Sequence, residues 1–214
     1  MQGRILAIGD IHGCNDRLGQ LLVRLGVEMQ TDTLIFIGDY IDRGPDARGV
    51  IETLLQIRQA SPKAVFLKGN HEELFLNFYC EGRDETLFLC NGGANTLASY
   101  GLTVAEARTG RGIPQSHLDF ISSLRLTHEA EGYLFVHAGI RPGIPLVDQV
   151  PEDLLWIRYA FIESDEDFGR TVVFGHTPLR EPLIEPNKIG IDTGAVYGGR
   201  LTAIELPSGE VHQV

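Results

Sequence analysis

Short apolar runs alternate with segments of helical periodicity in the first third of the chain. Residues 15–25 place leucines at helical i, i+3, i+4 and i+7 spacing, and residues 46–59 show a similar one-sided pattern that Pro62 ends. Three apolar stretches have the length and composition of strands: residues 4–9, 33–38 and 64–69. This alternation predicts a β-α-β-α-β unit with a parallel sheet.

The pattern changes after residue 70. Residues 71–124 predict a mostly helical segment, which the glycine-containing stretches 91–93 and 109–114 interrupt. We expect the later strands to form a second, largely antiparallel sheet, because they are short and separated by Gly and Pro. These strands are predicted at residues 133–139, 171–177, 187–194 and 200–206. The whole pattern predicts a mixed α/β (α+β) fold in a single domain spanning residues 1–214.

Composition narrows the class of protein. The chain has 214 residues, of which 43% are hydrophobic, which suits one domain with a sizeable core. Its 29 acidic and 18 basic residues give a net charge of −11. This charge argues against broad binding of nucleic acid or anionic membranes, although a locally positive site could still bind a phosphorylated substrate.

The cysteines and the N-terminal segment indicate where the protein works. Cys14, Cys80 and Cys90 are an odd number without the spacing of a disulfide framework, which predicts free thiols in a reducing compartment. No apolar run approaches the length of a membrane span, and a strand-like run follows the initiator methionine where a signal peptide would have its apolar region. We therefore expect a cytoplasmic protein.

Polar residues follow each strand-like run of the first half, directly after a glycine. Because ligands bind at the carboxyl ends of parallel strands, we expect these side chains to meet at one edge of the sheet. They are Asp10 and His12, then Asp39, Asp42 and Arg43, then Asn70 and His71. Two runs of the second half end in the same way and add His137 and His176.

Two carboxylates, one amide and three imidazoles in this set are candidate metal ligands. Mixed ligands of this kind suit Mn, Fe or Zn better than calcium, which prefers oxygen alone. A single Gly-Asp or a single histidine is more often structural, and we interpret His117, His128 and His212 in this way. Five strand-end clusters built from metal-ligand residues are not expected from ordinary turns, so the sequence predicts a metal site.

The ordered motifs GDIHG, GDYIDRG, GNHE, HAG and FGHT resemble the phosphoprotein phosphatase family of calcineurin-like metallophosphoesterases. They are most similar to its bacterial branch, the lambda-phage type of serine/threonine phosphatase, and IDTGAVYGG at 191–199 resembles the closing segment of the family. The resemblance implies two packed mixed β-sheets flanked by helices, with two divalent metal ions at the sheet edge. Manganese is usual for this branch, and the ligands would also accept Fe, Zn or Co.

The resemblance also assigns roles by motif position. A hydroxide bridging the two metals would attack phosphorus in line with the leaving group. His71 would be the general acid, oriented by Asp42, and Arg43 and Arg158 would bind the phosphate together with Asn70. One metal would be held by Asp10, His12 and Asp39, and the other by Asp39, Asn70, His137 and His176.

The chemistry of a phosphomonoester agrees with these roles. Asp10, Asp39 and a hydroxide leave two divalent ions with a net positive charge, and forked arginine side chains match phosphate oxygens. Two ions about 3.5–4 Å apart would acidify a bridging water and stabilise an in-line displacement. The alkoxide that leaves from Ser or Thr is a strong base and needs a proton, which a protonated His71 would supply.

We therefore predict a metal-dependent serine/threonine protein phosphatase that acts on phosphoproteins or small phosphoesters. The alternative is a symmetrical diadenosine tetraphosphate hydrolase of the same fold, whose opening motif Cys14 also fits. Asp42-Arg43-Gly44 and FGHTP at 174–178 favour the phosphatase.

Two further classes fit less well. A nuclease or phosphodiesterase of the wider group would have a second histidine where Pro178 stands. A catalytically inactive phosphoprotein-binding module would lack a ligand, and none is missing. Residues 75–125 are where we expect features that select the substrate.

Overall fold

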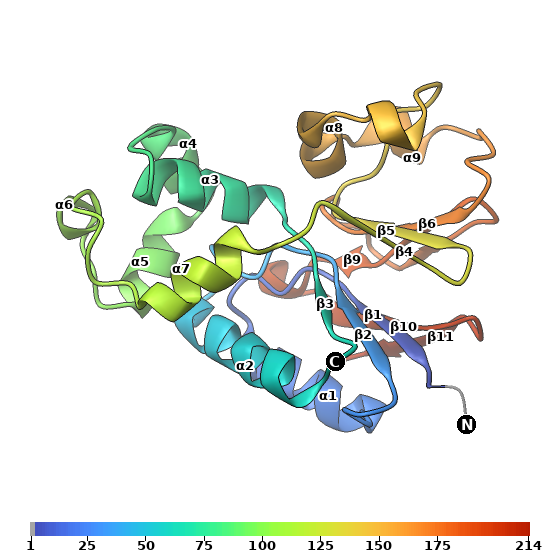
Figure 1. Ribbon diagram of the computed structural model, residues 1–214, viewed down its shortest axis with the longest axis horizontal. Coiled ribbons are helices and arrows are strands. Elements are labelled where there is room, and N and C mark those ends of the chain that lie inside the picture. The colour runs from blue at the N-terminus through green and yellow to red at the C-terminus, as the bar shows by residue number, and fades with distance from the viewer. Residues whose placement is uncertain (1–2) are drawn as a thin grey trace.

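Two β-sheets pack face to face in the computed structural model, which describes residues 3–214, and helices cover their outer faces (Figure 1). The first sheet has the strand order β11-β10-β1-β2-β3, and the short β9 pairs with β10. Its strands are β1 (Ile5–Ile8), β2 (Thr33–Phe36), β3 (Val65–Phe66), β9 (Asp192–Thr193), β10 (Arg200–Leu206) and β11 (Glu210–Gln213). The strands β1, β2 and β3 are parallel, which confirms the predicted β-α-β-α-β unit.

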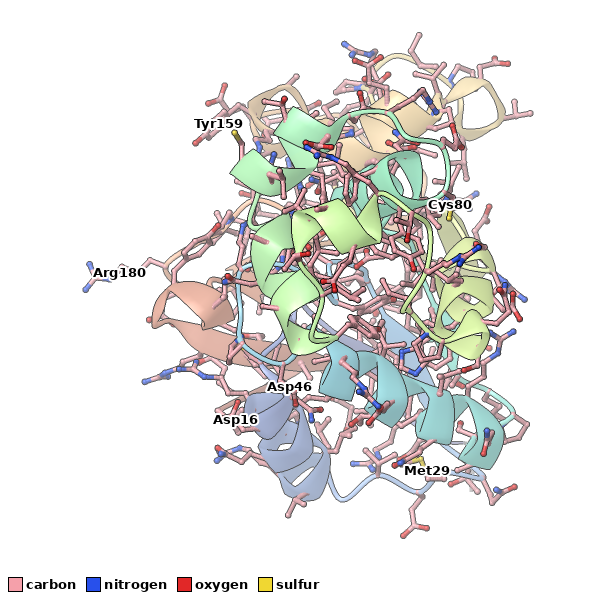
Figure 2. All side chains as sticks on the ribbon, turned by 90° about the vertical axis from the view of Figure 1, so that its left-hand side faces the viewer. Asp16, Met29, Asp46, Cys80, Tyr159 and Arg180 are labelled. Atoms are coloured by element: carbon pink, nitrogen blue, oxygen red, sulfur yellow. The ribbon has the colours of Figure 1, made fainter. Side chains whose placement is uncertain are left out.

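Helices α1 (Asn15–Leu25) and α2 (Ala47–Ala60) connect these parallel strands, and both were predicted. Asp46, which Figure 2 labels, caps α2 by accepting a hydrogen bond of 2.9 Å from the backbone N–H of Gly49. Strand β1 is apolar throughout because both of its faces are buried. Leu6 and Ile8 pack in the cluster that contains residues of α1 and α2, whereas Ile5 and Ala7 pack between the sheets.

The second sheet has the strand order β4-β5-β6-β8-β7. Its strands are β4 (Thr127–Ala130), β5 (Tyr133–Val136), β6 (Thr171–Phe174), β7 (Leu183–Ile184) and β8 (Lys188–Gly190). Helices α8 (Pro151–Trp156) and α9 (Tyr159–Ile162) lie over its outer face (Figure 1). Apolar residues of these two helices join one buried cluster with Leu134, Val136, Val172 and Phe174 of the sheet.

The expectation of a second, largely antiparallel sheet is wrong. The central pairs β5–β6 and β6–β8 are parallel, and only the outer pairs are antiparallel. A helical crossover separates β5 from β6, and a sheet covered on both faces favours such parallel strands. Residues 200–206 form β10 and pair with β1 in the first sheet. Both sheets are thus mixed, as the family resemblance implies.

A group of short helices lies beside the carboxyl ends of β1 and β2 (Figure 1). They are α3 (Asn70–Tyr79), α4 (Glu85–Cys90), α5 (Gly93–Ser99), α6 (Val104–Ala107) and α7 (Gln115–Ser122). The predicted interruptions are found between α4 and α5 and between α6 and α7. Two 3-10 turns, η1 (Leu146–Asp148) and η2 (Ala195–Tyr197), complete the regular elements of the described residues.

Two further predictions concern the cysteine thiols and membrane-spanning segments. All three cysteines have free thiols, with Cys14 buried and Cys80 and Cys90 exposed, and Figure 2 labels Cys80. Within residues 3–214, no helix has both the length and the apolar character needed to cross a bilayer.

Candidate metal centre

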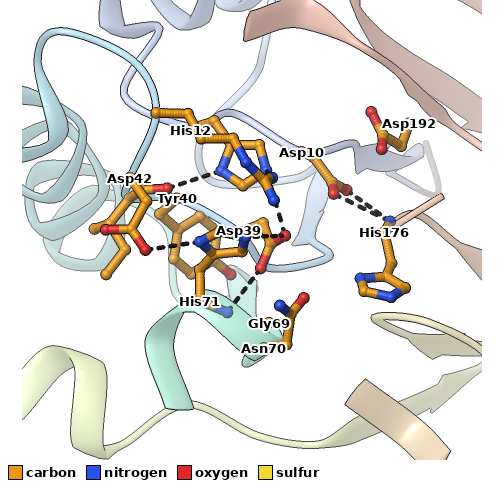
Figure 3. A network of polar contacts seen from close by, with 12 residues as sticks. Asp10, His12, Asp39, Tyr40, Asp42, Gly69, Asn70, His71, His176 and Asp192 are labelled. Carbon is orange, nitrogen blue, oxygen red and sulfur yellow. Dashed lines mark hydrogen bonds and ion pairs between the residues drawn. The ribbon is translucent and has the colours of Figure 1, made fainter. Parts of the chain in front are cut away.

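The predicted site residues come together where strands of both sheets end (Figure 3). Asp10 and His12 follow β1, Asp39 follows β2, and Asn70 and His71 begin α3 after β3. His137 and His176 follow β5 and β6 of the other sheet. All of these side chains are at most 4% exposed, so the packing of the two sheets forms a buried polar site.

Unusual backbone conformations accompany these side chains. Five non-glycine residues near the site have positive φ values: His12 (45°), Asp39 (51°), Asp42 (67°), Arg43 (65°) and His176 (63°). Non-glycine residues adopt this region rarely, and such strain gathers at functional sites. Glycine is required at position 69, where a Cβ atom would lie 2.1 Å from Oδ1 of Asp39. The local backbone is therefore shaped around the carboxylate of Asp39.

Asp39 lies at the centre of the site, with histidines on both sides. Its Oδ2 is 3.3 Å from Nε2 of His12 and 3.9 Å from Nε2 of His71. Its Oδ1 is 3.4 Å from Nε2 of His137. Burial acts to raise the pKa of Asp39, but the surrounding imidazoles outweigh it and lower this pKa far below its usual range.

Two groups of side chains around Asp39 are close enough to hold a metal ion. One group is His12, Asp39 and His71, the other is Asp39, His137 and His176, and the donor atoms in each lie within 4.8 Å of one another. Asn70 joins the second group through its Oδ1, which is 3.0 Å from Nε2 of His137. The shared member is Asp39, the residue expected to bridge two metals.

Hydrogen bonds fix which nitrogen of His12 and His137 faces the site. Nδ1 of His12 lies 2.8 Å from the carbonyl oxygen of Ile41, and Nδ1 of His137 lies 2.9 Å from that of Ile37. Since a carbonyl only accepts, each Nδ1 must donate, which leaves a lone pair on Nε2 when the ring is neutral. Burial lowers the pKa of His12 to about 3 and also lowers that of His137, so both rings are neutral near pH 7.

Asp10 lies at the side of His176 rather than within either close group. Its two carboxylate oxygens accept hydrogen bonds of 3.3 and 3.0 Å from the backbone N–H of His176. Burial, together with the negative charges of Asp192 and Asp39, raises the pKa of Asp10 well above its usual value. A cation beside Asp10 would stabilise its ionised form.

His71 has different partners from the other histidines. Its Nδ1 lies 2.7 Å from Oδ2 of Asp42, and both side chains are completely buried. The hydroxyl of Thr96 donates to Oδ1 of Asp42 over 2.5 Å and accepts the backbone N–H of Asp42 over 2.8 Å. The chain thus contains a buried series Thr96–Asp42–His71 that leaves Nε2 of His71 facing the site.

Both predicted arginines reach the site, from opposite sides. Nη1 of Arg43 lies 2.5 Å from Nε2 of His12, and its guanidinium is 5.6 Å from the ring centre of Tyr197. Nη1 of Arg158 donates to the carbonyl oxygen of His176 over 3.2 Å. Both side chains are only partly buried, so they border the opening of the site.

Several observations show that these residues fit divalent metal ions. The donors are imidazole nitrogens, carboxylate oxygens and an amide oxygen, which suit transition metals. Nε2 of His71 and Nε2 of His176 are buried and have no hydrogen-bond partner among the described residues. Buried polar atoms are normally paired, so Nε2 of His176 is available to a metal ion and Nε2 of His71 to a substrate.

Three supporting residues were not found from the sequence. Glu72 is fully buried, and its carboxylate accepts the backbone N–H groups of Gly69, Asp39, Tyr40 and Ile41 at 2.8–3.3 Å. Thr96 lies within residues 75–125, the segment that we expected to select the substrate. Asp192 is 4% exposed and lies beside Asp10, and burial raises its pKa to about 6. A Glu directly after Asn-His was a visible signal, whereas Thr96 and Asp192 become neighbours only through the tertiary fold.

A buried polar site with two candidate cation positions, at the joined edge of two mixed sheets, defines the class of metal-dependent phosphoesterases. The profile of the calcineurin-like phosphoesterases matches residues 3–202, and the chain belongs to this family. Both the fold and the phosphatase family resemblance expected from the motifs are thereby confirmed.

Relatives with different activities resemble the chain. A serine/threonine-protein phosphatase 1 of Salmonella typhimurium is 35% identical over 94% of this chain and 91% of its own length. A bis(5'-nucleosyl)-tetraphosphatase PrpE [asymmetrical] of Anoxybacillus flavithermus is 31% identical over 97% and 92%. The crystal structure of a "putative diadenosine tetraphosphatase" superposes with a TM-score of 0.75 at 26% identity, covering 100% of this chain and 94% of the other.

Proposed function

We propose that this phosphoesterase is a serine/threonine protein phosphatase, and the buried series Thr96–Asp42–His71 carries the proposal. Burial acts to lower the pKa of His71, but the negative charge of Asp39 and the hydrogen bond that the ring donates to Asp42 outweigh it and raise this pKa. His71 can thus hold a proton on Nε2, facing the site. Hydrolysis of a phosphoserine or phosphothreonine needs such a proton, because its leaving group is a strongly basic alkoxide.

The metal ligands in this proposal are the residues around Asp39. One ion would be held by Asp10, His12 and Asp39, and the other by Asp39, Asn70, His137 and His176. When bound, two divalent ions supply a nucleophile near neutral pH and neutralise charge on the phosphoryl oxygens. We propose manganese, the metal that the motif resemblance implies, because the carboxylate and amide oxygens of the set suit it.

The chain's own residues bind and orient the phosphoryl group. Arg43 and Arg158 border the site from opposite sides, so their guanidinium groups would hold phosphate oxygens between them. The amide of Asn70 would add a hydrogen bond from the first turn of α3. Asp42 keeps the His71 ring in one orientation, because its hydrogen bond fixes Nδ1.

Hydrolysis of a dinucleoside tetraphosphate is the second candidate. The 31% identical tetraphosphatase and the structure with a TM-score of 0.75 favour it. A nucleotide leaves as a phosphate, which is a weak base and has little need of a general acid. The buried and hydrogen-bonded His71 therefore favours the phosphatase, and the relative at 35% identity supports the same choice.

A side-by-side assay tests this proposal. Metal-stripped protein is reconstituted with Mn²⁺, and kcat/KM is measured for a phosphothreonine peptide and for diadenosine tetraphosphate. We expect a strong preference for the peptide. A strong preference for the dinucleotide would contradict the proposed phosphoprotein substrate. If the metal-bound protein hydrolysed neither substrate, the proposal that it is a phosphatase would be wrong.

A further inference from the structure

A groove lies between α3, the start of α4 and α8, near the candidate metal centre. It has a volume of about 550 Å³ and is lined by acidic, amide and apolar side chains: Glu73, Leu74, Asn77, Asp84, Leu87, Glu152 and Trp156. Figure 1 shows α3 and α4 on one side and α8 on the other. No residue of this lining has a role in the proposed hydrolysis.

Both walls of the groove connect directly to the centre. Glu73 lies one turn after Asn70 on α3, and residues three apart lie on the same side of a helix. On the other wall, the rings of Trp156 and His176 are 6.1 Å apart and almost perpendicular. Nε2 of His176, at this inner end, is one of the two buried site nitrogens without a partner. The groove therefore adjoins the site on the side of His176.

The acids of the groove are not paired with cations in the described part of the chain. Among residues 3–214, no ion pair within 4 Å involves Glu73, Asp84 or Glu152. The two nearby arginines form ion pairs with other carboxylates. Arg83 pairs with Glu81, and Arg141 pairs with Asp153. The groove therefore presents a negative potential.

The surface around the centre thus has a positively charged part and a negatively charged part. Arg43 and Arg158 border the phosphate position, whereas the groove beside it is acidic. Leu87 is 46% exposed, and together with Trp156 it gives the groove apolar surface as well. A ligand that matches this pattern has a phosphate, positive charges a few residues away, and apolar side chains.

We propose that this groove binds the segment flanking the phosphorylated residue of a substrate protein, and that it selects segments rich in Lys and Arg. The inference rests on the proposed phosphatase function. A dinucleoside polyphosphate is anionic along its polyphosphate chain, so the same acids disfavour it. Charge complementarity of this kind acts on encounter and on specificity.

The test uses three phosphothreonine peptides of equal length, flanked by Arg, Ala or Asp residues, and 4-nitrophenyl phosphate as a small substrate that cannot reach the groove. The protein is compared with a triple variant, Glu73→Gln, Asp84→Asn and Glu152→Gln, which keeps the shapes of the side chains. A matched variant, Glu28→Gln, Glu131→Gln and Asp165→Asn, removes the same charge from exposed loops between other elements.

We expect the unmodified protein to prefer the Arg-flanked over the Asp-flanked peptide by about tenfold in kcat/KM, the scale of several exposed charge pairs. The groove variant should lose this preference, and so should the unmodified protein in about 0.5 M salt, because screening weakens exposed charges. The matched variant should keep it, and all three proteins should hydrolyse 4-nitrophenyl phosphate equally, which shows that the variants fold.

Two results would overturn the inference while leaving the phosphatase intact: equal turnover of all three peptides by the unmodified protein, or loss of the preference in the matched variant as well. A third result, turnover of diadenosine tetraphosphate with no turnover of any peptide, would overturn the groove and the proposed function together. The pattern of activity therefore separates the two failures.

Discussion

His71 and His137 lie on opposite sides of Asp39 and have different hydrogen-bond partners. On one side, His71 has a carboxylate at Nδ1, contributed by Asp42 at 2.7 Å. On the other, His137 has a backbone carbonyl at Nδ1, contributed by Ile37 at 2.9 Å. Both rings are completely buried and both lie within 4 Å of Asp39. The difference between them comes from the hydrogen-bond partner behind each ring.

This difference separates a proton donor from a metal ligand. Burial lowers the pKa of His137, and a carbonyl cannot restore it, so the ring stays neutral with its Nε2 lone pair available. Asp42 and Asp39 outweigh burial at His71 and raise its pKa, so that ring can remain protonated. Two histidines of the same exposure can thus perform different chemistry, and substitutions at five residues test this comparison.

Replacing the residue between the two histidines should have the largest effect. Asp39→Asn removes the carboxylate that both candidate metal groups share. Loss of outer-shell partners alone weakens metal binding by about 10–100-fold, so the loss of this shared ligand should exceed about a hundredfold and abolish activity. Elemental analysis and a metal titration check the result. Normal metal content in the variant would contradict the role of Asp39.

Substituting one histidine on each side of Asp39 tests the two roles separately. We expect His71→Asn to retain both metals and to lose about 10²–10⁴-fold in kcat on a phosphothreonine peptide, the usual range for a general acid. On 4-nitrophenyl phosphate, whose leaving group needs little protonation, the loss should be far smaller.

His137→Asn provides the matched control for His71→Asn. It should lower metal content and reduce activity on the two substrates to the same degree, because a metal ligand serves both reactions. Equal losses on the two substrates for His71→Asn would contradict its role as an acid. Measuring metal content and both rates on the same preparations separates the two histidines.

Removing the carboxylate that accepts the hydrogen bond from Nδ1 of His71 should lower the pKa of His71, as burial does for His137. In Asp42→Asn, burial is opposed by less negative charge, so the pKa of His71 falls. The protonated acid exists below this pKa and is lost as pH rises through it. The alkaline decline of kcat on a phosphothreonine peptide should therefore move to lower pH, with a loss of about 10–100-fold at neutral pH. An unchanged pH profile would show that Asp42 does not control His71.

The sequence could predict the inner residues of this site because each directly follows a strand-like run. Asp10, Asp39 and His137 are positioned by the parallel strands that precede them, and periodicity identifies such strands well. The pairing of the second sheet was harder to predict. Strands as short as β7 and β8 carry too little pattern to fix their direction, and β10 joins the first sheet through contacts far apart in the sequence.

The contact of Thr96 with Asp42 could not be predicted from the sequence for a related reason. It lies 54 residues from Asp42, on a helix that the apolar pattern does not orient towards the site. A threonine in a short helix is ordinary, and only its two hydrogen bonds to Asp42 distinguish it. Supporting residues of this kind depend on the tertiary arrangement, whereas the ligands depend on the ends of individual strands.

The smallest expected effect concerns this threonine. Thr96→Val keeps the shape but removes the hydroxyl, which leaves Oδ1 and the backbone N–H of Asp42 without their partner. A hydrogen bond contributes about 0.5–1.5 kcal/mol, so kcat on a phosphothreonine peptide should fall by about 2–12-fold, and unfolding free energy by about 1–3 kcal/mol. Thr96→Ser keeps the hydroxyl and should recover most of both. If valine instead slowed 4-nitrophenyl phosphate equally, or serine failed to restore the rate, Thr96 would stabilise the fold without positioning Asp42 and His71.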